Sequence, residues 1–212
     1  MNQATNHLGS DCPEAGFVDG PVRDRELGRV LLRIARGAIG ERLGAPAMPL
    51  PTHDALAVPG ATFVTLRRDG ALRGCIGSLE PRRRLGIDVH ENAVGAAFRD
   101  PRFTPLRRPE FEAVVVEVSL LARSEPLRFS GEAELLAQLV PGRDGLVLEV
   151  GERRATFLPQ VWEALPVPRD FIAALKQKAG LPQEFWSPAL RARRYRVAKW
   201  SETDFATGEA RR

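Results

Sequence analysis

The sequence predicts an α+β protein in which mostly antiparallel strands pack against helices. Two pairs of strand-like segments meet at short turns, Asp69-Gly70 and Gly151-Glu152, and turns this short join antiparallel neighbours. Segment 27–39 has apolar residues at helical spacing with charged residues between them. Hairpins and helices therefore occur along one chain of 212 residues, which is long enough to bury a substantial core.

The first ordered element is expected after residues 1–21, a polar and aperiodic segment that we interpret as a disordered tail. Asp24 is a suitable N-cap for the helix that follows, and Gly44 is a suitable stop. The proline-rich segment 46–59 is then expected to form an ordered surface loop rather than a linker between domains.

The first hairpin is expected to pair segment 61–68 with segment 71–79. If its turn has two residues, Cys75 lies opposite Val64 and on the same face of the sheet as Arg73. Apolar residues occur on both faces of this hairpin. We therefore expect Cys75 to be shielded, in or near a cleft.

A helix is expected to follow Glu80-Pro81 and to end at Asp100, because the residue before a proline is disfavoured in the α region. Asp88 and Glu91 lie three residues apart and resemble a capping box at the start of this helix.

The remaining elements are expected to alternate in the same way. They are a buried strand at 114–121, a helix at 132–140, paired strands at 146–150 and 153–158, helices at 159–165 and 170–179, and a last strand at 194–200. We assign the folded domain to residues 22–201 and expect 202–212 to be a frayed tail.

The composition is typical of a soluble globular protein, with 43% hydrophobic and 27% charged residues. No apolar run reaches the roughly 18 residues that a membrane span needs. Residues 1–19 have neither the basic start nor the apolar region of a secretion signal. We therefore expect a cytoplasmic protein that does not enter the membrane.

The chain is basic, with a formal net charge of +4 and a pI near 9.7. Its densest basic segments are Arg82-Arg83-Arg84 and the cluster at 191–196. Such a charge permits nucleic-acid binding without requiring it, and aromatic residues do not alternate with the arginines as in a base-stacking surface. We interpret these arginines mainly as solvated surface.

A zinc site is not expected and no cofactor is assigned, whereas the sequence leaves open whether carboxylates hold a metal in the cleft. The only cysteines, Cys12 and Cys75, lie far apart, and the three histidines form no close pairs with each other or with cysteine. The Gly-Cys-Ile-Gly sequence at 74–77 also lacks the spacing and the following Lys-Ser/Thr of a phosphate-binding loop.

The most informative segment is 72–81, in which Cys75 lies between Gly74 and Gly77, with Arg73 before it. Glycines allow another backbone or a ligand to approach closely. Cys75 is a candidate nucleophile or acceptor group whose thiol pKa Arg73 would lower. Alternatively, it is a small buried side chain. His90 is the candidate base, although a surface position on a helix explains it better.

Four further polar residues are candidates for binding. Asp100 and Arg102 either lie at the mouth of a cleft or form an ion pair in a turn that ends the helix. Glu117, within an apolar strand, is either paired with an arginine or part of the site. Gln160 is the one polar candidate for ligand contact in a segment whose Trp162 we assign to the core.

Several short motifs, taken in order, resemble the AMMECR domain family, and more closely its bacterial branch, AmmeMemoRadiSam system protein A. The resemblance covers roughly 27–200 of the chain. Ser78-Leu79 replaces the Thr-Phe often found in eukaryotic members, which favours the bacterial branch. The motifs are Leu72-Arg73-Gly74-Cys75-Ile76-Gly77, Glu91-Asn92-Ala93, Phe98-Arg99-Asp100-Pro101-Arg102-Phe103, Asp144-Gly145-Leu146, Thr156-Phe157-Leu158-Pro159-Gln160-Val161-Trp162 and Lys178-Ala179-Gly180-Leu181.

This resemblance implies two unequal lobes with the cysteine motif near the cleft between them. It also implies two partners, a Memo-like protein and a radical S-adenosylmethionine enzyme, but it does not imply a reaction. We therefore expect a cytosolic component of such a system, with a ligand-binding or catalytic cleft around Cys75. An RNA-binding module and a non-catalytic interaction scaffold remain the alternatives.

Overall fold

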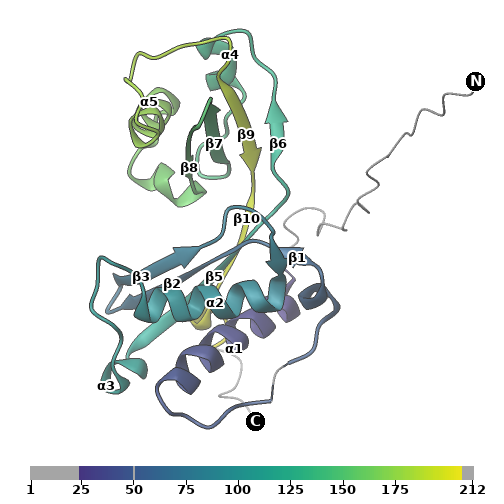
Figure 1. Ribbon diagram of the computed structural model, residues 1–212, viewed down its shortest axis with the longest axis vertical. Coiled ribbons are helices and arrows are strands. Elements are labelled where there is room, and N and C mark those ends of the chain that lie inside the picture. The colour runs from purple at the N-terminus through teal and green to yellow at the C-terminus, as the bar shows by residue number, and fades with distance from the viewer. Residues whose placement is uncertain (1–23, 50, 207–212) are drawn as a thin grey trace, which may run out of the picture.

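A computed structural model describes residues 24–49 and 51–206, which form two lobes of unequal size (Figure 1). The small lobe spans residues 125–195, and the large lobe contains the remaining described residues. The large lobe holds α1 (Arg25–Arg42), η1 (Asp54–Ala57), β1 (Pro59–Gly60), β2 (Thr62–Arg68), β3 (Ala71–Gly77), β4 (Arg83–Arg84), α2 (Leu85–Phe98), α3 (Arg108–Phe111), β5 (Val114–Leu121), β10 (Val197–Ser201) and η3 (Glu202–Asp204). The small lobe holds β6 (Glu125–Leu127), α4 (Glu132–Ala137), β7 (Gly145–Val150), β8 (Arg153–Phe157), η2 (Pro159–Glu163), α5 (Pro168–Lys178) and β9 (Arg191–Tyr195).

Each lobe is built on a four-stranded sheet. The order is β10-β5-β2-β3 in the large lobe and β6-β9-β7-β8 in the small lobe. All strand pairs among the described residues are antiparallel. The predicted α+β class with mostly antiparallel sheet is therefore confirmed. The tail expected at 1–21 lies outside the described residues.

The first helix forms as its sequence predicts. The Asp24 side chain accepts hydrogen bonds from the backbone N–H groups of Glu26 and Leu27, at 2.9 and 3.2 Å. This satisfies two of the N–H groups that the first turn of a helix leaves unpaired. Beyond the helix, Gly44 has a φ of +81°, which glycine adopts without steric cost.

One face of the large sheet is covered by α1 and α2, which lie side by side across it (Figure 1). Val64 and Leu66 of β2 and Val116 and Val118 of β5 are fully buried in this layer. Alternate residues of both strands therefore face the helices, and the residues between them lie on the opposite face of the sheet.

The first hairpin has the expected turn but not the expected register. Asp69 and Gly70 have φ values of 51° and 78°, as a two-residue hairpin turn requires. Arg73 is an extra residue in β3, however, and the register shifts at this bulge. Cys75 consequently lies opposite Thr65 and not opposite Val64, so the predicted face for Cys75 is wrong. A shift of one residue turns every later side chain to the other face.

The helix that follows the hairpin starts later than expected, because residues 83–84 form β4 and pair with β1. Asp88 therefore lies inside α2 with only 1% of its side chain exposed, and the predicted capping box with Glu91 is wrong. The helix ends at Phe98, two residues before the expected end at Asp100.

The predicted last strand is in fact two strands that belong to different sheets. β9 pairs with β6 and β7 in the small lobe, and β10 pairs with β5 in the large lobe. At the crossing, the Ala122 N–H donates to the Arg196 carbonyl at 2.9 Å. The chain thus passes between the lobes along two adjacent segments (Figure 1), which ties the lobes together.

The core of the small lobe lies between its sheet and α5. Trp162 stacks on Phe171 with ring centroids 3.8 Å apart, and its indole N–H donates to the Asp144 carbonyl at 2.7 Å. Only 3% of Trp162 is exposed, so its assignment to the core is confirmed.

The folded domain continues past residue 201. Residues 202–204 form η3, and Glu202 forms an ion pair with Arg36 and accepts from the Val116 N–H at 2.8 Å. Phe205 packs against the core of the large lobe. The boundary expected at 201 is therefore too early, and residues 202–206 are not a frayed tail.

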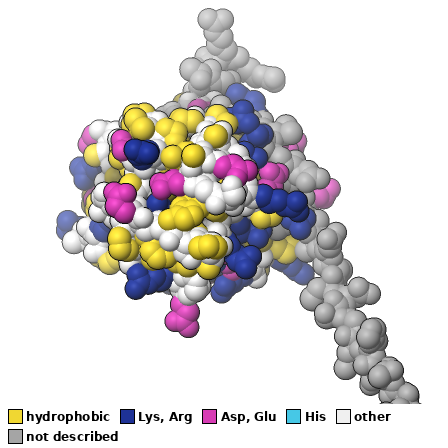
Figure 2. Space-filling model, turned by 90° about the horizontal axis from the view of Figure 1, so that it is seen from above, with side chains coloured by type: hydrophobic (Ala, Val, Ile, Leu, Met, Phe, Trp, Pro, Cys, Tyr) yellow, Lys and Arg dark blue, Asp and Glu magenta, His cyan; other side chains and the backbone are white. Residues whose placement is uncertain are grey.

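Charges of both signs are mixed on the surface. On the face seen from above in Figure 2, basic and acidic side chains alternate with hydrophobic ones. Two arginines of the 82–84 run are paired internally, Arg82 with Glu80 at 2.7 Å and Arg83 with Asp88 at 2.9 Å. None of the helices in the described ranges is long and apolar enough to cross a membrane.

Candidate functional site

The backbone of Cys75 is held at the free edge of the large sheet. Its N–H donates to Asp100 Oδ2 at 2.8 Å, and its carbonyl accepts from Arg102 Nη2 at 3.3 Å. The thiol Sγ accepts a hydrogen bond from the Thr65 hydroxyl at 3.3 Å. Asp100 and Arg102 therefore form hydrogen bonds with the main chain of Cys75.

Asp100 and Arg102 form the ion pair that one of the two sequence interpretations predicted. Arg102 Nη2 lies 2.7 Å from Asp100 Oδ2, and Arg102 Nε lies 3.0 Å from Oδ1. The Arg102 guanidinium holds the pKa of the Asp100 carboxyl well below its usual range, helped by the backbone N–H groups of Cys75 and Arg102. This pair fixes the turn after α2 and covers the edge of β3.

Arg73 does not take the role that the sequence suggested. Its guanidinium Nε lies 3.2 Å from Glu110 Oε1, and its Nη2 donates to the Thr104 carbonyl at 3.0 Å. These contacts join the bulge in β3 to the segment around α3. The guanidinium that was expected to lower the thiol pKa of Cys75 is therefore bound elsewhere.

Both glycines of the motif are explained by packing. A Cβ added at Gly74 would lie 2.1 Å from the Ala96 carbonyl oxygen of α2, and one added at Gly77 would lie 2.2 Å from the Phe63 ring. Real Cβ atoms do not approach other atoms so closely. Gly74 thus lets α2 lie against the sheet, and Gly77 accommodates an aromatic ring from the opposite strand.

Three other candidate residues lie on different elements and do not form one site. Glu117 is paired with Lys199 at 2.9 Å and with Arg67 at 3.2 Å, so the expectation that an arginine pairs with it is confirmed. Gln160 is exposed on η2 of the small lobe. His90 is a half-exposed residue of α2, with Nδ1 3.7 Å from Glu91 Oε1.

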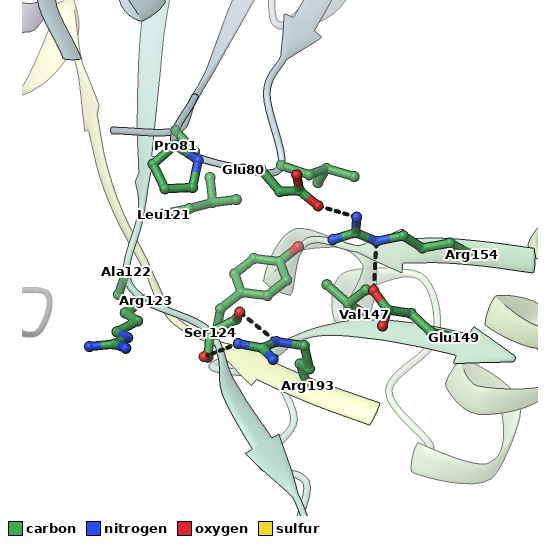
Figure 3. A pocket seen from close by; sticks show the side chains of 13 residues that line it. Glu80, Pro81, Leu121, Ala122, Arg123, Ser124, Val147, Glu149, Arg154 and Arg193 are labelled. Atoms are coloured by element: carbon green, nitrogen blue, oxygen red, sulfur yellow. Dashed lines mark hydrogen bonds and ion pairs between the residues drawn. The ribbon is translucent and has the colours of Figure 1, made fainter. Parts of the chain in front are cut away.

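The end of the motif, rather than Cys75, leads into a cavity between the lobes (Figure 3). The cavity has a volume of about 310 Å³. Its walls come from the residue before β2, the loop after β3, the end of β5 with the segment that follows it, and the face of the small sheet that lies away from the core of the small lobe. The lining residues are Ala61, Leu79, Glu80, Pro81, Leu121, Ala122, Arg123, Ser124, Val147, Glu149, Arg154, Arg193 and Tyr195.

One side of this cavity carries a chain of ion pairs between the lobes. Arg154 of the small lobe pairs with Glu80 of the large lobe, and its Nε lies 2.8 Å from Glu149 Oε1. Glu80 also pairs with Arg82. Hydrogen bonds from Arg154 and Arg82 hold the pKa of Glu80 below its ordinary value. These charges connect the loop after β3 with β7 and β8.

The opposite side carries Arg193 of β9 (Figure 3). Tyr195 of the same strand also lines the cavity. Arg193 Nε donates to the Ser124 hydroxyl at 2.9 Å, and Nη2 donates to the Ser124 carbonyl at 3.0 Å. The Tyr195 hydroxyl donates to the Phe157 carbonyl at 3.0 Å. Burial raises the pKa of Tyr195 to about 12, so this group is a neutral phenol near pH 7.

A more open cavity of about 500 Å³ adjoins the first and shares Leu79, Glu80 and Arg154 with it. Asp88 supports this wall through five hydrogen bonds of 2.7–2.9 Å. The donors are the Thr62 N–H and hydroxyl, the Ser78 hydroxyl, Arg83 and Asn92. Asp88 therefore fixes the loop after β3 against α2 and positions the rim that both cavities share.

Sequence reasoning identified the motif but missed Arg154, Arg193 and Tyr195. Strand alternation places Arg154 and Arg193 on the face of the small sheet away from its apolar core, which was a usable signal. That this face meets the other lobe follows only from the crossing of the chain. Cys12 lies outside the described residues. Within the described ranges, no three His, Cys, Asp or Glu side chains group so that they could hold a metal ion.

Comparison with known proteins agrees with this architecture. The sequence profile of the AMMECR1 family matches residues 32–200. The chain belongs to the AMMECR1 family. A family relative from Methanothermobacter thermautotrophicus is 38% identical over 187 residues, covering 84% of this chain and 95% of the relative. One from Thermococcus gammatolerans is 36% identical over 201 residues, covering 88% and 95%.

A solved structure has a similar fold. The crystal structure of an uncharacterized protein from Pyrococcus horikoshii superposes with a TM-score of 0.75 at 33% identity, covering 83% of this chain and 91% of that one. The two-lobed arrangement is therefore similar to that of an archaeal protein solved by crystallography.

Proposed function

We propose that this AMMECR1-family protein is a cytosolic component of an AmmeMemoRadiSam-type system that holds a ligand in the cavity between its lobes. It acts there with a Memo-like protein and a radical S-adenosylmethionine enzyme, which perform the chemistry. The observation that carries the proposal is the cavity itself, which both lobes build and which residues 79–81, just after the 72–77 motif, help to line. Cavities between lobes are common ligand sites.

A holding role is favoured over nucleophilic catalysis by the surroundings of Cys75. A thiol nucleophile needs a neighbouring base or cation that favours the thiolate. Among the described residues, the hydrogen-bond partner of Sγ is the Thr65 hydroxyl. The nearby Asp100 and Arg102 are bound to each other and to the Cys75 main chain. In this proposal, Cys75 is therefore a structural residue of the edge strand and not a nucleophile.

The RNA-binding alternative is less well supported. Binding to the nucleic-acid backbone needs basic side chains that neutralise phosphates. Arg82 and Arg83 already pair with Glu80 and Asp88, and the face seen in Figure 2 has mixed charges. A phosphate would have to displace these carboxylates.

Two leucines of the first hairpin region provide a matched test. Leu79 lines both cavities with 37% exposure, whereas Leu72 is 39% exposed on the hairpin and lines neither. The system is reconstituted with the Memo-like and radical enzymes of the same genome, and consumption of S-adenosylmethionine is measured. We expect Leu79→Trp to lower turnover by about tenfold, equivalent to about 1.4 kcal/mol of lost binding. Leu72→Trp should leave turnover unchanged.

The same reconstitution can contradict the proposal in two ways. Equal turnover of the Leu79→Trp and Leu72→Trp proteins would show that the cavity is not the working site. Equal turnover with and without this protein would show that the system does not need it. Circular dichroism and thermal unfolding of both variants confirm that each is folded.

A further inference from the structure

We propose that the cavity between the lobes binds a small organic oxyanion, a carboxylate or a phosphate monoester on a short apolar chain, with Arg193 as its anion-binding residue. This inference rests on the proposed function only in taking the cavity as the ligand site. It adds the chemical class of the ligand, and its test needs neither of the two partner proteins.

Arg193 is placed to receive an anion. It lies on the face of the small sheet away from the core, opposite Val147 in the register of β7 and β9, and it lines the cavity. Its contacts are two hydrogen bonds to Ser124, and no carboxylate in 24–49 or 51–206 forms an ion pair with it. A guanidinium has five N–H donors, so the Ser124 contacts orient Arg193 and leave donors for a bidentate oxyanion.

The adjacent arginine on the same strand shows the contrast. Arg194 points to the other face of β9, where it lies 3.5 Å from Glu125 and 3.8 Å from Asp144. Two neighbouring arginines therefore have different surroundings: Arg194 lies near two carboxylates, whereas Arg193 faces the cavity and forms no ion pair with a carboxylate among the described residues. The absence of an acidic partner at Arg193 is thus a local property of the cavity.

The other charges of the cavity do not oppose an anion. Glu80 and Glu149 both pair with Arg154, and Glu80 pairs in addition with Arg82. The lining contains three arginines and two glutamates, so its formal charge is 3 − 2 = +1. An anion entering beside Arg193 therefore meets carboxylates that are already neutralised, and the attraction is strengthened where water is excluded.

The remaining lining defines the rest of the ligand. Leu121, Val147, Pro81 and the neutral ring of Tyr195 give the cavity apolar surface. A volume of about 310 Å³ is at the lower end for small-molecule sites, which span roughly 300–1,000 Å³. At about 30 Å³ for each water-sized unit, it holds on the order of ten non-hydrogen atoms. A short acyl or alkyl chain that ends in an oxyanion fits this space.

Hexanoate, hexyl phosphate and hexan-1-ol are suitable probes of the full chain. Titrations are followed by NMR of the arginine Nε–H groups and of the Leu121 and Val147 methyl groups, with the Arg193 signal assigned from Arg193→Lys. We expect at least one of the two anions to shift the Arg193, Leu121 and Val147 signals, and hexan-1-ol to bind about 10- to 100-fold more weakly, the usual effect of charge-assisted hydrogen bonds. Comparing hexanoate with hexyl phosphate decides between a carboxylate and a phosphate.

Arg193→Gln and Arg191→Gln form a matched pair of variants. Arg191 lies two residues away on the same face of β9 and does not line the cavity. Arg193→Gln should weaken anion binding about 10- to 100-fold, and Arg191→Gln should not. If Arg193→Gln does not fold, the wild-type shift map still decides whether the anion lies at Arg193.

The outcomes separate the two proposals. Equal binding of hexan-1-ol and both anions in the cavity, anion shifts confined to another region, or no binding of any probe would overturn the oxyanion site. Anion binding at Arg193 together with unchanged turnover of Leu79→Trp would support the oxyanion site and overturn the proposed function. If Arg191→Gln weakens anion binding as much as Arg193→Gln does, the effect comes from the general surface charge. That result would also overturn the site.

Discussion

The Asp100→Asn substitution tests how the edge strand that carries Cys75 is held. Asp100 Oδ2 accepts from the Cys75 N–H at 2.8 Å and from Arg102 Nη2 at 2.7 Å, and Oδ1 accepts from the Arg102 N–H and Nε at 3.1 and 3.0 Å. Asparagine keeps the shape but turns one acceptor into an NH₂ donor. Each carboxylate oxygen of Asp100 accepts from two N–H groups. Whichever way the asparagine amide is oriented, its NH₂ group therefore faces two N–H donors and can accept from neither.

The expected loss follows from these four contacts. A hydrogen bond to a charged group contributes about 1.5–3 kcal/mol, and a buried donor left unpaired costs about 1–3 kcal/mol. Arg102 is 55% exposed, so water replaces part of what its guanidinium loses, whereas the Asp100 side chain is only 2% exposed. We therefore expect Asp100→Asn to lower the free energy of unfolding by about 2–3 kcal/mol at pH 7.

The loss should depend on pH with a defined sign. The pKa of Asp100 in the folded protein lies below the ordinary value of 3.8, so the unfolded chain takes up the proton first as the pH falls. The stabilisation is therefore complete above about pH 4 to 5 and decreases as the pH falls towards the lowered pKa. Asparagine does not titrate, so the difference in stability between wild type and variant should narrow from pH 5 to pH 2.

Urea unfolding followed by tryptophan fluorescence measures this difference at several pH values. Asp69→Asn is the control, because Asp69 is 90% exposed and its φ of 51° is also tolerated by asparagine. It should change stability by less than about 0.5 kcal/mol. A loss for Asp100→Asn no larger than the control, or a loss that stays constant between pH 5 and pH 2, would refute the reasoning.

Two further predictions concern the motif. Gly74→Ala should lower the free energy of unfolding by about 3 kcal/mol or more, since its Cβ would lie 2.1 Å from the Ala96 carbonyl of α2, a backbone atom that cannot move alone. Gly37→Ala on α1 is the control, because an added Cβ there meets nothing within 4 Å, and it should stabilise the protein by about 0.5–1 kcal/mol. Urea unfolding measures both variants. A similar loss of stability in Gly74→Ala and Gly37→Ala would contradict the packing argument. Cys75→Ser in a Cys12→Ser background should leave the turnover of the reconstituted system unchanged, because Thr65 is the described hydrogen-bond partner of the thiol. A normally stable Cys75→Ser protein without turnover, together with alkylation of Cys75 in Cys12→Ser at unusually low pH, would instead establish a reactive thiol.

Elements with local signals were predictable from the sequence. Asp24 caps α1 by accepting hydrogen bonds from N–H groups in the first turn of the helix. Asp69-Gly70 forms its turn through backbone angles that need no distant contact. The β7–β8 hairpin and the buried Trp162 were likewise found. In each case the residues that decide the structure lie within a few positions of one another or follow a simple periodicity.

The bulge at Arg73 could not be predicted in this way. Nothing within the hairpin requires an extra residue, and the side chain of Arg73 is bound by Glu110, which lies 37 positions later in the chain. The bulge moves Cys75 to the other face of the sheet. A register error of one residue therefore gave Cys75 the wrong cross-strand neighbours and wrongly placed Arg73 beside its thiol. The buried Asp88 was missed for the same reason, since its donors come from β2, the loop after β3 and β4.

The sequence by itself determined the class of fold, its hairpins and capped helices, and the motifs that mark the family, because these depend on short-range geometry and on the period of apolar residues. Only the tertiary structure decided where the candidate site lies. Segment 194–200 is predicted as one continuous strand, but its two halves join different sheets. This crossing brings Arg193 and Tyr195 close to the loop after β3. A cavity between lobes depends on contacts between residues far apart in the chain, and no local pattern encodes their distance.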